Sequence, residues 1–97
     1  MKNDELTKRE KETLKFIVYY RKNNFGISPT ERQVFQHLNK TLPPKERLSS
    51  HVQIVRVVQY LRNKGMLLDP KNHKELAGKH RILVPTPQGE KVGARLK

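Results

Sequence analysis

The segment Ser49–Leu67, SSHVQIVRVVQYLRNKGML, constrains the fold more than any other part of this 97-residue chain. Ser50 and Gln53 fit the S-x-x-E/Q capping box, in which two side chains satisfy backbone N–H groups at the start of a helix. Gly65 fits the left-handed position that commonly follows the last turn of a helix. The pattern therefore predicts a helix over residues 51–64.

The predicted helix has two chemically different faces. One face is apolar and holds Ile54, Val57, Val58 and Leu61. The other face contains no acidic residue and comprises Val52, Gln53, Arg56, Gln59, Tyr60 and Asn63. In the major groove of DNA, Arg pairs with guanine, Gln or Asn pairs with adenine, and a methyl group contacts thymine. The polar face therefore indicates a helix that reads the major groove.

The distribution of charge also favours a polyanionic partner. The net charge is +12, and residues 1–12 hold as many acidic as basic side chains, so residues 13–97 carry the whole excess. A basic excess of this size is typical of proteins that bind nucleic acid. With 34% hydrophobic residues the chain can form one modest core, so we expect a single domain over residues 1–97.

Several other classes of protein are disfavoured by the residues present. The sequence has no cysteine, and its four histidines lack the H-x₃₋₅-H spacing of zinc sites, so we expect neither a metal nor another cofactor. No catalytic constellation is recognisable, and we expect a protein that is not an enzyme. The chain also lacks a membrane-length apolar run and the apolar region of a secretory signal. We therefore expect a cytoplasmic protein, located on the nucleoid when bound.

Two further helices are predicted ahead of the first segment. Both begin with capping boxes, formed by Thr7 with Glu10 and by Thr30 with Gln33. Helical spacing of apolar residues extends the first over Leu6–Asn24 and the second to about Lys40. The connector Thr41–Ser49 contains a Pro-Pro pair, which argues against a continuous helix there.

The periodicity changes after Gly65. Residues 66–68 and 82–84 are short apolar strand candidates, and the polar, basic stretch 69–81 connects them, which predicts a β-hairpin with a long tip. Thr86-Pro87 then predicts a short C-terminal helix to about Leu96. The expected fold class is mainly α with a small β-hairpin: a winged helix-turn-helix of three helices, a wing and a C-terminal helix.

Several short motifs also resemble a known family. They are L-T-K-R at residues 6–9, Phe16-Ile17, G-I-S-P-T at 26–30, Ser50, and L-R-N-K-G at 61–65. They resemble the N-terminal DNA-binding domain of the LexA repressor family, over about residues 6–68. The stretch 83–89 is similar to the L-T-x-x-G motif that follows the wing in MarR-like regulators. The chain differs from LexA in its longer connector and wing, and it carries no peptidase region.

The resemblance implies a set of DNA-binding residues. In the recognition helix they are Ser50, His51, Val52, Gln53 and Arg56. Basic side chains elsewhere are further candidates for contact with phosphates or the minor groove: Lys45 and Arg47 in the connector, and Lys71, Lys74, Lys79 and Arg81 in the wing. Some alternatives stay open. Gln53 either completes the capping box or contacts a base. Val52 either contacts a thymine methyl or packs locally against the connector. Ser50 is a cap that can also contact phosphate, and the wing cations contact DNA or belong to a solvated loop.

The sequence thus predicts a sequence-specific protein for double-stranded DNA, most simply a transcriptional regulator such as a repressor. One alternative is a replication, recombination or architectural factor of a mobile element. A second alternative is a protein-interaction module that binds an acidic partner. A homodimer is compatible with each DNA-binding role, with a contact through the first helix or through the C-terminal residues Val92, Ala94 and Leu96.

Overall fold

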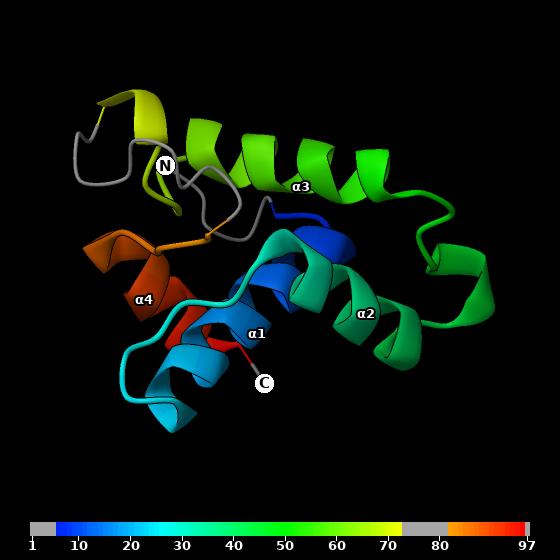
Figure 1. Cartoon of the computed structure of the whole chain (residues 1–97), viewed down its shortest axis with the longest axis horizontal. Helices are drawn as coiled ribbons and strands as arrows, with labels where there is room; N and C mark the ends of the chain where they lie inside the picture. Colours follow the sequence, from blue (N-terminus) through cyan, green and yellow to red (C-terminus); the bar gives the residue numbers. More distant parts are fainter. Residues whose placement is uncertain (1–5, 73–81, 97) are drawn as a thin grey trace.

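The computed structural model describes residues 6–72 and 82–96, and within them the chain is mainly helical (Figure 1). The α-helices are α1 (Lys8–Asn23), α2 (Glu31–Thr41), α3 (His51–Asn63) and α4 (Pro87–Arg95). Two 3₁₀ turns, η2 (Pro44–Glu46) and η3 (Pro70–Asn72), follow α2 and α3 respectively. These bounds confirm the predicted helices to within a few residues. None of the helices described is long and apolar enough to cross a membrane.

Two of the three predicted capping boxes are confirmed and one is wrong. Thr7 and Glu10 bond reciprocally at the start of α1, and Thr30 and Gln33 do so at the start of α2. Ser50 is the N-cap of α3 by its backbone, but its side chain makes no capping bond. Gln53 Oε1 instead accepts the Ser49 N–H at 2.6 Å. The Gln53 side chain therefore bonds one residue further back than the box requires.

Helix α1 lies at the centre of the fold and packs against α2, α3 and α4. Its Leu14 and Ile17 are fully buried, as are Val34 and Leu38 of α2. The predicted apolar face of α3 is buried on the same core, which confirms the orientation of that helix; its members are Ile54, Val57, Val58 and Leu61. Removing such side chains from water is the main stabilising contribution to a domain of this size.

The segments that flank residues 73–81 pair with each other through the backbone. The Leu68 N–H donates to Val84 O at 2.8 Å, and the Thr86 N–H donates to Met66 O at 3.0 Å. An antiparallel bridge joins Leu67 and Pro85. The predicted partner stretch 82–84 is thus displaced toward 84–86. Within the described ranges these contacts form isolated bridges and no extended strand, and the tip of the predicted hairpin lies outside those ranges.

A second bridge ties the returning chain to the start of α2. Ile82 pairs antiparallel with Thr30, and the Leu83 N–H donates to Pro29 O at 3.0 Å. Pro29 and Leu83 are both fully buried. The segment after residue 81 therefore lies between the entry to α2 and the exit from α3.

Helix α4 closes the other side of α1. Thr86 caps it by accepting the Gly89 N–H at 2.9 Å, and Pro87 occupies its first turn, as the sequence predicts. Gly89 lies directly against the chain after α3, because a Cβ at this position would be 1.9 Å from Met66 O. Only glycine permits this approach of α4 to the backbone.

Candidate nucleic acid interface

The outer face of α3 is exposed to solvent, as its sequence predicts. Val52 is 58% exposed and Tyr60 52% exposed, and Arg56 and Asn63 are also exposed. Gln59 Nε2 donates to Asn63 Oδ1 at 3.0 Å, so two amides are aligned along the helix. The surface thus presents a guanidinium, paired amides and a branched apolar side chain on one rigid element.

Three carboxylates that border α3 are paired with basic side chains, one of which lies on α1. Two of them, Glu10 and Glu31, are buried, and Glu46 is only partly exposed. Their pairings are Glu10 with Lys64 at 2.7 Å, Glu31 with His51 at 3.5 Å, and Glu46 with Lys8 at 3.3 Å. Because α3 has no acid of its own, its outer face carries no negative side chain. An approaching anion therefore meets only cationic, neutral polar and apolar groups on this face.

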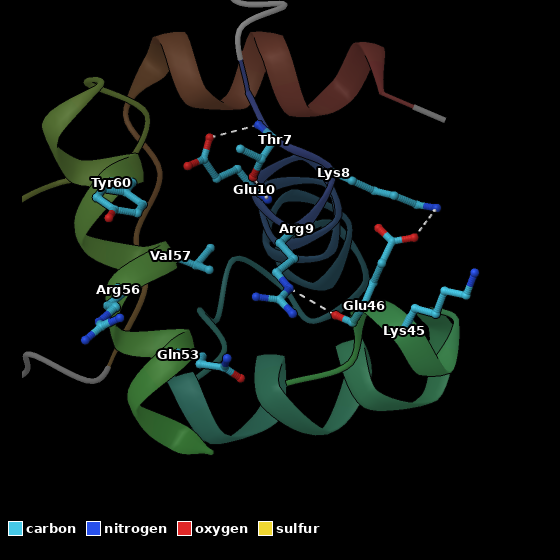
Figure 2. A pocket seen from close by; sticks show the side chains of 10 residues that line it. All are labelled: Thr7, Lys8, Arg9, Glu10, Lys45, Glu46, Gln53, Arg56, Val57 and Tyr60. Atoms are coloured by element: carbon cyan, nitrogen blue, oxygen red, sulfur yellow. Dashed lines mark hydrogen bonds and ion pairs between the residues drawn. The ribbon is translucent and has the colours of Figure 1, made fainter. Parts of the chain in front are cut away.

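A cleft of about 480 Å³ runs between α3, the start of α1 and η2 (Figure 2). Val57 points toward α1 in this view, whereas the guanidinium of Arg56 points away from it (Figure 2). Lys45 lies on the η2 side of the cleft and forms no ion pair with any other described residue. The predicted DNA-binding set includes Lys45, Gln53 and Arg56 of this lining, but it does not include the cations Lys8 and Arg9.

The connector between α2 and α3 is anchored on α1 by Arg9. Its Nε donates to Glu46 O at 3.0 Å and its Nη2 to Arg47 O at 3.3 Å. Arg47 in turn donates through Nε to Leu42 O at 3.0 Å, at the end of α2. The predicted DNA-binding residue Arg47 is therefore used locally through one nitrogen, whereas Lys45 extends from a fixed loop.

His51 is turned toward α2 and lies beside the outer face of α3. Its ring centroid is 5.8 Å from that of Phe35, and its Nε2 is 3.5 Å from Glu31 Oε1. Ser50 is exposed just ahead of it. Five residues were predicted in the recognition helix. Val52 and Arg56 are exposed on its outer face, and Ser50 and His51 lie at its N-terminal edge. Gln53 lines the cleft, as does part of Arg56.

The structure describes only the first residues of the predicted wing, up to residue 72. Lys71 is exposed in η3, and its N–H donates to Asp69 Oδ1 at 3.0 Å. The other predicted wing cations, Lys74, Lys79 and Arg81, lie outside the described residues. Lys71 therefore places one basic side chain in the 3₁₀ turn that follows α3.

The acidic and histidine side chains do not form a cluster suited to a metal ion in the part of the chain that is described. No group of three or more His, Asp or Glu side chains is placed there to hold a metal ion. Comparisons of this chain with protein-family models, with curated proteins and with solved structures produced no match.

Proposed function

We propose that this chain binds double-stranded DNA sequence-specifically and acts as a transcriptional regulator with a winged helix-turn-helix fold. In this proposal α3 enters the major groove, and the basic segment 69–81 contacts the backbone or the minor groove beside it. One observation carries the proposal: the outer face of α3 is exposed, rigidly supported and free of carboxylates. The motifs shared with the LexA DNA-binding domain support the same role.

The chemistry of the outer face fits direct readout of bases. Arg56 has the geometry to donate two hydrogen bonds to a guanine, and Val52 can contact a thymine methyl. Gln59 and Asn63 carry amides suited to adenine, although their mutual bond must open or be shared when a base is contacted. Gln53 is less suited to a base, since its Oε1 already accepts from Ser49.

The supports on either side of α3 fit the same proposal. Lys64 at its end is held by Glu10, and the connector at its start is held by Arg9. A recognition helix anchored at both ends keeps its side chains at fixed positions relative to the groove, which direct readout requires. The connector is long, but its anchoring removes the freedom that such a length would otherwise give the helix.

The winged-helix architecture is supported by the backbone pairing around residues 73–81. The chain pairs with itself directly after α3, at residues 66–68 with 84–86, and returns beside Thr30 at the start of α2. Any wing formed by the intervening residues begins and ends next to α3. Lys71 stands at its beginning and is exposed, which suits contact with the phosphates that flank the groove.

Selection from a library of random duplexes at roughly 150 mM salt tests this function. The proposal expects one enriched motif, bound with an affinity that falls steeply as salt rises. Binding to every duplex alike, with long cooperative coverage, would favour a mobile-element or architectural factor. Absence of salt-sensitive binding to any duplex would favour an acidic protein partner and would refute the proposal.

A further inference from the structure

The turn after α1 holds an aromatic side chain in an unusual position. Phe25 is 99% exposed and has a φ of 56°, in the left-handed region. The Gly26 N–H donates to Arg21 O at 2.8 Å, which is the six-to-one bond of a Schellman helix end. Glycine or asparagine ordinarily occupies the residue that Phe25 fills here. The backbone therefore holds a large apolar ring in water at a position that disfavours it.

The exposed large apolar side chains of the described residues divide into two groups. Val52, Val55 and Tyr60 belong to α3. The other group lies on the last turns of α1 and in the turn that follows, with Tyr19 67% exposed, Phe25 99% and Ile27 63%. Figure 1 shows this turn on the opposite side of the molecule from α3. The second group therefore has no part in the DNA contact proposed above.

A cleft of about 350 Å³ lies next to this turn, between the end of α1 and α4. Val18 and Ala94 contribute apolar lining, and Gly26 forms one edge. Charges of both signs come from Arg21, Lys22 and Glu90. An engineered apolar cavity of about 150 Å³ is enough to bind benzene. The cleft is therefore large enough to take a phenyl ring, and it is adjacent in sequence to one that is exposed.

We propose that two copies of this chain associate through this end, with Phe25 of each copy seated in the cleft of the other. A two-fold interface uses the same patch on both copies. Because Phe25 is the neighbour of Gly26 at the cleft edge, a two-fold axis beside the turn allows both insertions at once. The charges are also self-complementary, since the same symmetry can bring Lys22 of one copy to Glu90 of the other.

The choice of a second copy follows from this self-complementarity: the ring, the cleft and both signs of charge lie on one patch. The net charge of +12 opposes association at low salt. Screening weakens that long-range repulsion far more than it weakens apolar contact. The association is therefore expected to strengthen with salt, which is the reverse of what salt does to binding of DNA.

Sedimentation of the whole chain up to about 100 µM, in about 0.1 and 0.5 M salt and without DNA, tests the proposal independently of the proposed function. The wild type is expected to form dimers, more strongly at the higher salt. Phe25→Gly is expected to weaken dimerisation at least about tenfold while raising the melting temperature of the dilute monomer, because glycine suits the left-handed position.

Two further variants complete the test. Ala94→Arg, which fills the cleft from an exposed position, is expected to weaken the dimer to a similar degree. Val52→Ser, on the exposed face of α3, is the matched control and is expected to leave association unchanged. A wild type that stays monomeric at both salt concentrations, or a Phe25→Gly chain that dimerises as strongly as the wild type, would overturn the proposal.

Discussion

The ammonium of Lys64, at the C-cap of α3, lies 2.7 Å from Glu10 Oε1, and the same oxygen accepts the Thr7 N–H at 3.0 Å. One buried carboxylate therefore both caps the start of α1 and holds the end of α3, across 54 positions of sequence. This contact joins the end of α3 to the start of α1, in addition to the buried apolar face of α3. The outer face of α3 owes part of its fixed position to a residue on another helix.

Replacement of Glu10 is expected to destabilise the protein strongly. Glu10→Ala removes a cap and leaves the partly buried Lys64 without its partner, with an expected loss of about 2–4 kcal/mol in the free energy of unfolding. Glu10→Gln keeps an oxygen acceptor for Thr7 and is expected to lose less. Urea denaturation measures both.

Glu12→Ala is the matched control for these variants. Glu12 is 4.0 Å from Lys15 in an i, i+3 pair on a partly exposed surface, so its removal is expected to change stability by no more than about 0.5 kcal/mol. Equal losses for Glu10→Ala and Glu12→Ala would show that the contact with Lys64 contributes nothing to the fold.

Gly89→Ala is expected to destabilise the docking of α4. The added Cβ would be 1.9 Å from the backbone oxygen of Met66, so α4 or the segment after α3 would have to shift. In a helix without such a contact, alanine is more stable than glycine by about 0.5–1 kcal/mol. Helix propensity alone would make the alanine variant more stable, whereas the packing predicts that it is less stable. The expected loss in the free energy of unfolding is about 2 kcal/mol or more, measured by thermal or urea unfolding. A more stable Gly89→Ala protein would contradict the close approach.

The extent to which the sequence predicted this fold differs between local and distant contacts. Local patterns sufficed for the four helices and for the buried face of α3, since capping and apolar spacing act within a few residues. They failed at Ser50, because Gln53 can satisfy either of two neighbouring backbone groups and only the loop geometry selects Ser49.

Contacts between residues far apart in the chain could not be predicted from a single sequence. The balanced charges of residues 1–12 suggested a neutral start to the chain, yet Lys8, Arg9 and Glu10 each reach residues at least 37 positions away. Such pairings depend on tertiary packing and leave no periodic pattern. For the same reason the pairing of Ile82 with Thr30 was not predicted. The exposure of Phe25 depends on the turn geometry, which the helix pattern alone does not specify.

Acidification is expected to destabilise the protein through His37. Its ring stacks on Phe16 with centroids 4.3 Å apart, and partial burial lowers the pKa of His37 below the ordinary value of 6.5, with Lys15 and Lys40 adding to this and Glu12 opposing it. The unfolded chain thus binds the proton more readily than the folded one. The contribution of His37 to stability is therefore complete above pH 6.5, and it is lost as the pH falls toward the lower pKa of the folded state.

The His37→Gln variant isolates this contribution. Free energies of unfolding compared at about pH 7.5 and about pH 5.5 are expected to fall more for the wild type than for the variant. An identical pH dependence in the two proteins would show that protonation of His37 is not coupled to folding.

Arg56→Ala is expected to weaken binding to a selected duplex by about 1–3 kcal/mol and to relax specificity at one base pair. Arg95, exposed at the end of α4, provides the matched control, and Arg95→Ala is expected to have little effect. Fluorescence anisotropy titrations with the selected duplex and with a scrambled duplex measure both the affinity and the specificity of each variant. An equal loss on the two duplexes would assign Arg56 to a phosphate.

Lys45→Gln is expected to behave differently from Arg56→Ala. Loss of one phosphate contact weakens binding to all duplexes alike and reduces the slope of log affinity against log salt by about 1. The anisotropy titration is repeated over a series of salt concentrations. An unchanged slope would place Lys45 outside the DNA contact, even though it extends from the anchored connector.

The central claim, that the outer face of α3 contacts DNA, is tested most directly by mapping amide chemical shifts of the isotopically labelled protein during titration with a selected duplex. The account predicts that the largest changes fall on residues 50–63 of α3 and on Lys45, with the 24–27 turn unaffected. Changes concentrated on α4 and the 24–27 turn, with α3 unperturbed, would contradict it.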